Sequence, residues 1–140
     1  MSEKIRLQQD RDFRLAVWGP DPQNPESGEL NPVERIHTLT PYGLMLISLG
    51  SCTTIVVHTY AQHHNIDLDQ VEIALDYKRT PEEVGYSEHI EEEIQFSGDL
   101  SSEEQDKLFQ ISHQCSIHKM FENGIEIQSQ LAQERSVVDG

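Results

Sequence analysis

The side chains best suited to chemistry in this 140-residue chain are two cysteines. The chain contains no other cysteine. Cys52 lies in a Gly-Ser-Cys-Thr-Thr run and Cys115 in a His-Gln-Cys-Ser-Ile-His-Lys run. One interpretation is that each is a small buried hydrophobe, the commonest role of a free cysteine. The other is that both line one site and cycle between dithiol and disulfide. Attack on a peroxide would then need the Cys52 thiolate and, because a mid-helix position gains little from the helix dipole, a cationic neighbour.

Seven histidines raise a different possibility, a zinc site built from thiolate and imidazole ligands. Two candidate ligand sets exist: His113 with Cys115 and His118, or Cys52 with His58, His63 and His64. The chain has neither a Cys-x-x-Cys nor a His-x-x-x-His spacing, and ligands two and three residues apart at a helix end seldom converge. We therefore expect no metal and no other cofactor, and a zinc-binding interaction module is the weaker hypothesis.

The charge of the chain disfavours two classes of partner. There are 10 Lys and Arg residues against 25 Asp and Glu, a net charge of −15, and no window carries the basic patch that phosphates require. Neither nucleic acid nor an anionic membrane surface is an expected partner. The N-terminus has no signal-type apolar core, and the longest apolar stretch, residues 44–61, is too polar to cross a bilayer comfortably. We expect a cytoplasmic protein.

Hydrophobic residues make up only 36% of the chain, slightly below the usual globular share. A shortage of apolar residues in a small domain indicates that a partner chain completes part of the core. The length allows one core, so we expect a single domain over residues 1–140.

The first half of the chain predicts a hairpin followed by a long helix. Residues 4–9 and 12–18 alternate apolar and polar side chains, as paired strands do. Residues 19–33 hold four of the six prolines and predict a polar loop with a short edge strand after it. Residues 40–65 predict one helix, capped by Thr40 and apolar nearly all round, because some two dozen residues are too many for a strand.

The region after the helix predicts two more strands. Residues 69–78 and 89–97 alternate, and the acidic stretch 79–88 joins them as a loop. In the second strand this alternation sends Glu92 inward, where a carboxylate needs a partner.

The C-terminal part predicts a helix and a last strand. Ser101 and Glu104 have the spacing of a capping box, opening a helix whose buried side ends with Cys115. Alternation over residues 125–131 predicts the strand, and the tail 134–140 is expected to fray. The fold class is a two-layer α+β domain with an antiparallel sheet.

Three blocks of sequence resemble the OsmC/Ohr family of bacterial and archaeal thiol peroxidases. The blocks are Thr40-Pro41-Tyr42-Gly43-Leu44 leading to Ser48-Leu49-Gly50-Ser51-Cys52-Thr53, then Gly98-Asp99-Leu100-Ser101, and then Cys115-Ser116-Ile117-His118-Lys119 with Gly124-Ile125-Glu126-Ile127. The last block is similar to the family's Cys-Pro-Val-His-Lys pattern, with Ser116 in place of proline. Together the blocks span residues 40 to about 130.

The resemblance implies an intertwined homodimer in which curved antiparallel sheets enclose two long central helices, with active sites at the subunit interface. It also implies that Cys52 is the peroxidatic cysteine. Its thiolate would attack the O–O bond of a small organic hydroperoxide, giving an alcohol and a Cys52 sulfenic acid. Cys115 would convert this to a disulfide, which a dithiol reductant would reduce.

This chain departs from the family at the residues that activate the cysteine. Family peroxidases carry a Glu nine or ten residues before the reactive cysteine, where this chain has Gly43 and Tyr42. Glu34 could replace that carboxylate, or Tyr42 could donate a hydrogen bond. The activating arginine comes from the N-terminal half, and we favour Arg35 because it lies closest before the helix. The alternative is a non-catalytic OsmC-like dimer that binds a small apolar or thiol ligand and leaves Cys52 with an ordinary pKa.

Overall fold

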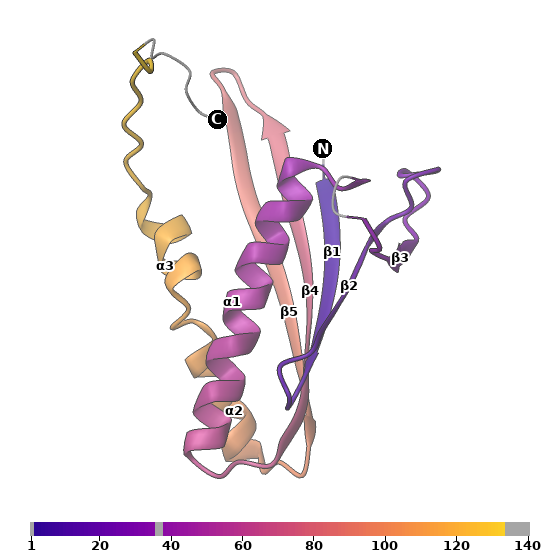
Figure 1. The fold of residues 1–140 in the computed structure, drawn as a ribbon, viewed down its shortest axis with the longest axis vertical. Helices are drawn as coiled ribbons and strands as arrows, with labels where there is room; N and C mark the ends of the chain where they lie inside the picture. The colour runs from indigo at the N-terminus through magenta and orange to yellow at the C-terminus, as the bar shows by residue number, and fades with distance from the viewer. Residues whose placement is uncertain (1, 36–37, 134–140) are drawn as a thin grey trace, which may run out of the picture.

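The computed structural model describes residues 2–35 and 38–133, arranged as one antiparallel sheet and three helices (Figure 1). The sheet has five strands in the order β3-β2-β1-β4-β5. The long helix α1 crosses one face of the sheet, and α2 and α3 lie along α1. The predicted α+β class and antiparallel sheet are confirmed, whereas the predicted fraying of residues 134–140 lies outside the described residues.

The N-terminal hairpin forms as predicted. β1 (Ser2–Asp10) pairs with β2 (Leu15–Pro20), and β1 places Ile5 and Leu7 in the core at 1% and 0% exposure. The short edge strand β3 (Leu30–Pro32) pairs with β2 and lies within the last residues of the predicted loop, not after it.

Helix α1 (Pro41–His63) is the expected long helix. The Thr40 hydroxyl accepts a hydrogen bond from the backbone N–H of Gly43, and Asn65, just past the helix, has a φ of +54°. At Gly50 α1 lies close to the sheet, because a Cβ there would lie 2.7 Å from Leu7 Cδ1 and 2.9 Å from Leu75 Cδ1. Among the described residues α1 is also the one helix long and apolar enough to cross a membrane, yet it packs against β1 and β4 as a core helix does.

The second hairpin is longer than the sequence indicated. β4 (Leu68–Pro81) and β5 (Tyr86–Gly98) pair along nearly their whole length. The prediction of a loop over 79–88 is wrong, because residues 79–81 continue β4 and residues 86–88 continue β5, so only 82–85 form the turn. Acidic residues near the hairpin tip concealed this, because their side chains are solvent-exposed and give no inward alternation.

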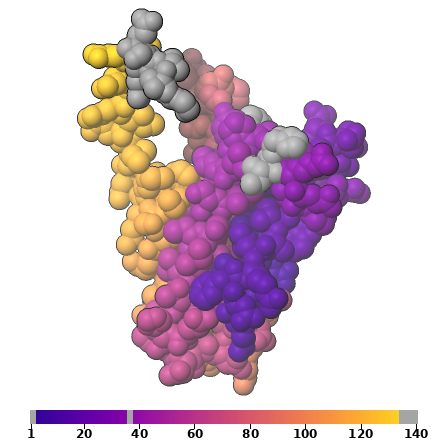
Figure 2. All heavy atoms as spheres, in the orientation of Figure 1, coloured from indigo at the N-terminus to yellow at the C-terminus, as the bar shows by residue number. Residues whose placement is uncertain are grey.

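The structure also corrects two C-terminal expectations. Helix α2 (Ser102–Ser112) has the predicted capping box of Ser101 and Glu104, but it ends before Cys115. Cys115 instead caps a separate helix, α3 (Ser116–Asn123). Residues 124–133 form no strand, because no neighbouring strand pairs with them in the described part of the chain, and Leu131 is 94% exposed. Figure 2 shows this segment at the rim of the molecule, beyond α3.

Candidate functional site

Folding brings the two cysteines together from distant parts of the chain. Cys52 is half-buried at the middle of α1, and Cys115 is fully buried at the junction of α2 and α3. Both are free thiols, and they are hydrogen-bond partners. The Cys52 Sγ also lies 3.9 Å from the hydroxyl oxygen of Ser116. The site is therefore a contact between the central helix and the start of α3.

Cys115 is held at this contact by the local structure of the turn. Its Sγ is the N-cap acceptor of α3 and receives the backbone N–H of His118 at 3.4 Å. Its carbonyl accepts the backbone N–H of Lys119 at 3.1 Å, the first helical hydrogen bond. Ser, Thr, Asp and Asn are the usual N-caps, so a thiol in this place is unusual, and it fixes the sulfur at the positive end of the helix.

Several hydrogen bonds favour the thiolate form of Cys52. Burial is the largest single influence and opposes ionisation. Against it act the Cys115 thiol, the backbone N–H groups of Ile117 and Ser116, and the Ser116 hydroxyl. Their combined effect outweighs burial, so the pKa of Cys52 lies below its usual value. A lowered thiol pKa is the property that a nucleophilic cysteine needs.

The environment of Cys115 raises the pKa of its thiol, whereas that of Cys52 lowers it. Burial raises its pKa, and the hydrogen bond to Cys52 raises it further, against smaller lowering effects from the His118 backbone and the Thr53 side chain. Cys115 thus stays protonated while Cys52 ionises, and its S–H donates to the Cys52 sulfur. Cys52 is thus the more acidic of the two thiols, and Cys115 is the one that keeps its proton.

The structure does not bring Arg35 to Cys52 within one protomer. Arg35 is exposed before α1, where its carbonyl accepts hydrogen bonds from Thr38, and within the described residues it makes no ion pair. The groups with the largest effect on the pKa of Cys52 include no arginine in this part of the chain. The other described arginines face carboxylates: Arg6 faces Glu72, Arg11 faces Asp67 and Asp69, Arg14 faces Asp10 and Asp12, and Arg79 faces Glu88.

Neither substitute for the family carboxylate reaches the thiols in this protomer. Glu34 is exposed beside Arg35. The Tyr42 hydroxyl accepts a hydrogen bond from Arg79 Nη1 at 3.3 Å, ten residues along α1 from Cys52. The Tyr42 hydroxyl is thus bound to a residue of β4 and not to either thiol.

Glu92 points inward as predicted, and its partner is His118. The carboxylate lies 3.7 Å from His118 Nδ1, and both side chains are less than one-fifth exposed. The other ring nitrogen of His118 lies 3.5 Å from a Glu122 oxygen. Burial raises the pKa of Glu92, and the charges of His118 and His113 partly offset this rise. From the sequence, His118 is a candidate zinc ligand and is not identified as the partner of Glu92.

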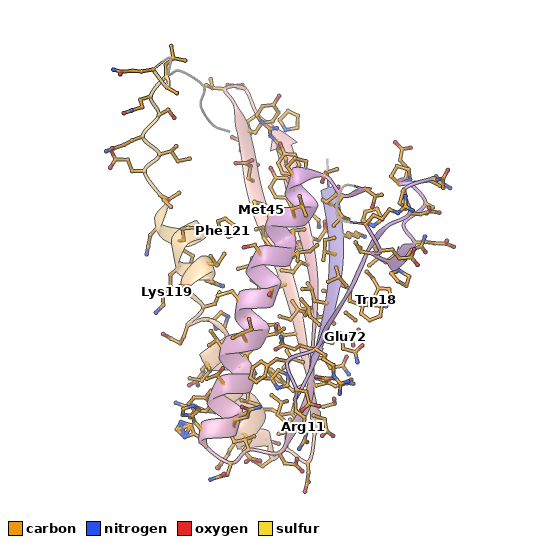
Figure 3. All side chains as sticks on the ribbon, in the orientation of Figure 1. Arg11, Trp18, Met45, Glu72, Lys119 and Phe121 are labelled. Atoms are coloured by element: carbon orange, nitrogen blue, oxygen red, sulfur yellow. The ribbon has the colours of Figure 1, made fainter. Side chains whose placement is uncertain are left out.

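A pocket of about 610 Å³ opens between α1, β5 and α3, and neither cysteine belongs to its lining. Met45 and Leu49 line it from α1 and Phe121 from α3, and Figure 3 shows Met45 and Phe121 on its two sides. Met45, Leu49 and Cys52 are spaced by four and three residues, so they share one stripe of the helix. The pocket therefore lies against the stripe of α1 that also carries Cys52, and its lining on that helix ends at Leu49. No sequence pattern predicted this pocket.

The described residues form no group of three or more His, Cys, Asp or Glu side chains suited to a metal ion. His58, one of the proposed zinc ligands, is buried, and its Nε2–H donates to the Gln9 carbonyl oxygen at 3.0 Å. His113 and His118 meet edge to face at 5.5 Å between ring centroids. The zinc hypothesis gains no support from these contacts.

Comparisons with known proteins agree on the kind of fold. A family model described as "OsmC-like protein" matches residues 35–130. Among solved structures, a crystal structure of an OsmC-like hydroperoxide resistance protein from Jannaschia sp. CCS1 is similar at a TM-score of 0.59 and 15% sequence identity, covering 94% of each chain. At that identity the likeness supports the fold alone. No curated protein matches.

Proposed function

The chain belongs to the OsmC-like protein family, and from that membership we propose that it is a thiol-dependent peroxidase that reduces organic hydroperoxides through Cys52 and Cys115. The observation that carries this proposal is the contact between the two thiols, in which hydrogen bonds lower the pKa of Cys52. Hydroperoxides as substrates are also supported by the description of the similar solved protein as a hydroperoxide resistance protein.

The proposed reaction begins at the Cys52 thiolate. It attacks one oxygen of the O–O bond, that bond breaks, and the departing alkoxide takes up a proton to become an alcohol. Cys52 is left as a sulfenic acid. The Cys115 sulfur then attacks the Cys52 sulfur, and the hydroxyl group leaves as water with the Cys115 proton. The disulfide returns to two thiols when a dithiol reductant supplies two electrons and two protons.

The alternative proposal is an OsmC-like dimer that binds a small apolar or thiol ligand without turnover. This alternative predicts that the pKa of Cys52 equals that of a free thiol, because a binding protein has no need of a thiolate. The hydrogen bonds from Ser116 and Ile117 argue against it, because they favour the charged form of Cys52. We therefore rank the peroxidase first.

A homodimer is part of the proposal because one copy leaves apolar surface exposed. Leu44 and Ile55 of α1 are 38% and 45% exposed, and they lie three helical turns apart on one stripe. The segment 124–133 exposes Ile127 at 81%. Exposed apolar patches of this kind mark interaction sites, and a second copy with its own long helix would cover them.

Arg35 is proposed to be the cation that stabilises the Cys52 thiolate of the other copy in the dimer. Within one protomer it precedes α1, and Cys52 lies about 16 Å further along the helix at 1.5 Å per residue. Its guanidinium makes no ion pair among the described residues, which leaves it available to the Cys52 thiol of a second copy. We further propose that residues 1–140 form one domain that acts in the cytoplasm.

The rate of alkylation by iodoacetamide as a function of pH tests the proposal against the alternative. Only the thiolate reacts, so the midpoint of the profile reports the pKa of Cys52. Wild type should show a midpoint below 8.5, the value of a free thiol, that Cys52→Ser removes. Arg35→Gln should raise the midpoint, whereas Arg14→Gln, a matched loss of an exposed arginine, should leave it in place. An ordinary midpoint in the wild type would favour the binding protein.

A further inference from the structure

We propose that Ser116 is a catalytic residue of this chain, and that its hydroxyl and its backbone N–H hold the Cys52 thiolate from within the same protomer. The inference rests on the proposed function, because it names a group that prepares Cys52 for attack on the hydroperoxide. It is carried by the place of Ser116 at the start of α3 and by the contact of its hydroxyl with the Cys52 sulfur.

Ser116 is a departure from the family pattern, which has proline at this position. Proline has neither a hydroxyl group nor a backbone N–H. A serine there offers two hydrogen-bond donors that the family pattern lacks. The chain also lacks the family carboxylate, because Tyr42 and Gly43 occupy the positions nine and ten residues before Cys52. The donors of Ser116 therefore act in a chain from which the usual support of the thiolate is missing.

The start of α3 directs its free backbone donors at the two sulfurs. The first N–H groups of a helix have no partner within that helix. In α3 the third of them, from His118, donates to the Cys115 sulfur at 3.4 Å. The first two, from Ser116 and Ile117, donate to the Cys52 sulfur, and the Ser116 hydroxyl oxygen lies 3.9 Å from the same sulfur. The positive end of the helix dipole adds to these contacts and favours a thiolate there.

The backbone around Ser116 would accept the proline of the family pattern. A residue that precedes proline has to be extended, and Cys115 is extended, with a φ of −64° and a ψ of 132°. The first position of a helix is also a place where proline is favoured. Exchange of Ser116 for proline therefore removes the two donors and leaves the turn that carries Cys115 in place.

The rate of alkylation by iodoacetamide as a function of pH measures the contribution of Ser116. Ser116→Ala removes the hydroxyl and should raise the midpoint, so that the rate at neutral pH falls about threefold, as expected for one hydrogen bond. Ser116→Pro also removes the N–H, and the rate should fall about tenfold. At high pH, where Cys52 is fully ionised, both variants should react at least as fast as the wild type. Ser116→Thr keeps both donors and should behave as the wild type does.

Ser102 provides the matched control, because it is the first residue of α2 as Ser116 is of α3. It is exposed, and Ser101 before it is extended, so proline fits there as well. Ser102→Ala and Ser102→Pro should leave the midpoint in place. High salt should reduce the effect of Arg35→Gln, which removes a charge, and should leave that of Ser116→Pro unchanged, because salt screens charges and not contacts between neighbouring atoms.

Two results would overturn the inference. One is a midpoint for Ser116→Pro equal to that of the wild type, and the other is a midpoint that Ser102→Pro raises as much as Ser116→Pro does. A failure of the proposed function is distinguishable from both, because alkylation needs no hydroperoxide. If the midpoint moves as expected and cumene hydroperoxide is not consumed, the role of Ser116 toward the Cys52 thiolate stands and the peroxidase is refuted.

Discussion

At the scale of single residues, the acidity of Cys52 comes from hydrogen bonds made by the start of α3. The two backbone N–H groups, the Ser116 hydroxyl and the Cys115 thiol together overcome the cost of burying a thiolate. The usual family carboxylate is missing at Tyr42 and Gly43, and these contacts lower the pKa of Cys52 without it. Cys115 thus has two parts in our account, as a donor to the Cys52 thiolate and as the thiol that closes the disulfide.

Cys115→Ser separates these two parts. Serine is a good N-cap and its hydroxyl still donates a hydrogen bond, so α3 and the reactivity of Cys52 should survive. The variant should consume one equivalent of cumene hydroperoxide per chain and stop at the Cys52 sulfenic acid, detected as a dimedone adduct by mass spectrometry. Wild type should give almost no adduct. An intramolecular route to a disulfide in the variant, or equal adduct in both proteins, would refute the role of Cys115.

At the scale of elements, the short helix α3 has to hold Cys115 against α1 with few contacts of its own. None of its residues is buried, and Ile117, His118 and Met120 are half-buried. The contact between the Glu92 carboxylate and the His118 ring joins α3 to β5. We interpret it as the contact that keeps the resolving thiol in place.

Glu92→Gln tests this interpretation, with Glu93→Gln on the opposite face of β5 as its control. Loss of the pair should cost about 1 kcal/mol of the interaction that orders α3, which corresponds to roughly a fivefold change in an equilibrium. Formation of the disulfide from the sulfenic acid should slow by about that factor, while the first oxidation of Cys52 keeps its rate. Stopped-flow measurements with dimedone trapping distinguish the two steps. Equal effects of the two variants would contradict the interpretation.

The packing of α1 on the sheet is tested by a pair of glycines. A Cβ at Gly50 would clash with the ends of Leu7 and Leu75, and these side chains are fully buried and have little room to move. Gly50→Ala should therefore lose about 1 kcal/mol of unfolding free energy after the gain in helix propensity, or roughly 3 °C in Tm.

Gly43→Ala is the matched control, because a Cβ there meets other atoms only at 3.5 Å or more. It should be neutral or slightly stabilising in the same thermal unfolding experiment. If both alanines had the same effect, the close approach at Gly50 would not matter for stability.

At the scale of the whole molecule, the sequence predicted every element whose signal is local. Alternation identified the hairpins, Thr40 and Asn65 marked the ends of α1, and Ser101 opened α2. The break between α2 and α3 was missed because its N-cap is a thiol, which no common capping pattern includes. Residues 124–133 were misassigned because a strand needs a neighbouring strand, and alternation alone cannot say whether the same chain provides one.

For the site, the sequence predicted both cysteines and the inward direction of Glu92, because these depend on type and periodicity. It could not predict the partner of Glu92 or the pocket, because both depend on where α3 lies relative to β5. Arg35 stays a prediction, since its proposed action lies between two copies of the chain.

The exposed apolar surface predicts the state of the protein in solution. Sedimentation equilibrium should give twice the 16.0 kDa chain mass. Ile55→Lys places a charge on the exposed stripe of α1 and should weaken association, whereas Gln62→Lys, a charge at a polar exposed site near the end of the same helix, should not. A wild-type protein that is monomeric at micromolar concentration would contradict the proposed homodimer.

The central claim is that Cys52 and Cys115 form a redox pair driven by hydroperoxide, and counting thiols tests it most directly. The fully reduced protein, mixed with one equivalent of cumene hydroperoxide per chain, should lose both titratable thiols and about 2 Da of mass, with one alcohol formed per chain. Cys52→Ser should leave the hydroperoxide unconsumed. Two titratable thiols after prolonged exposure, together with consumption by Cys52→Ser at the wild-type rate, would contradict the account.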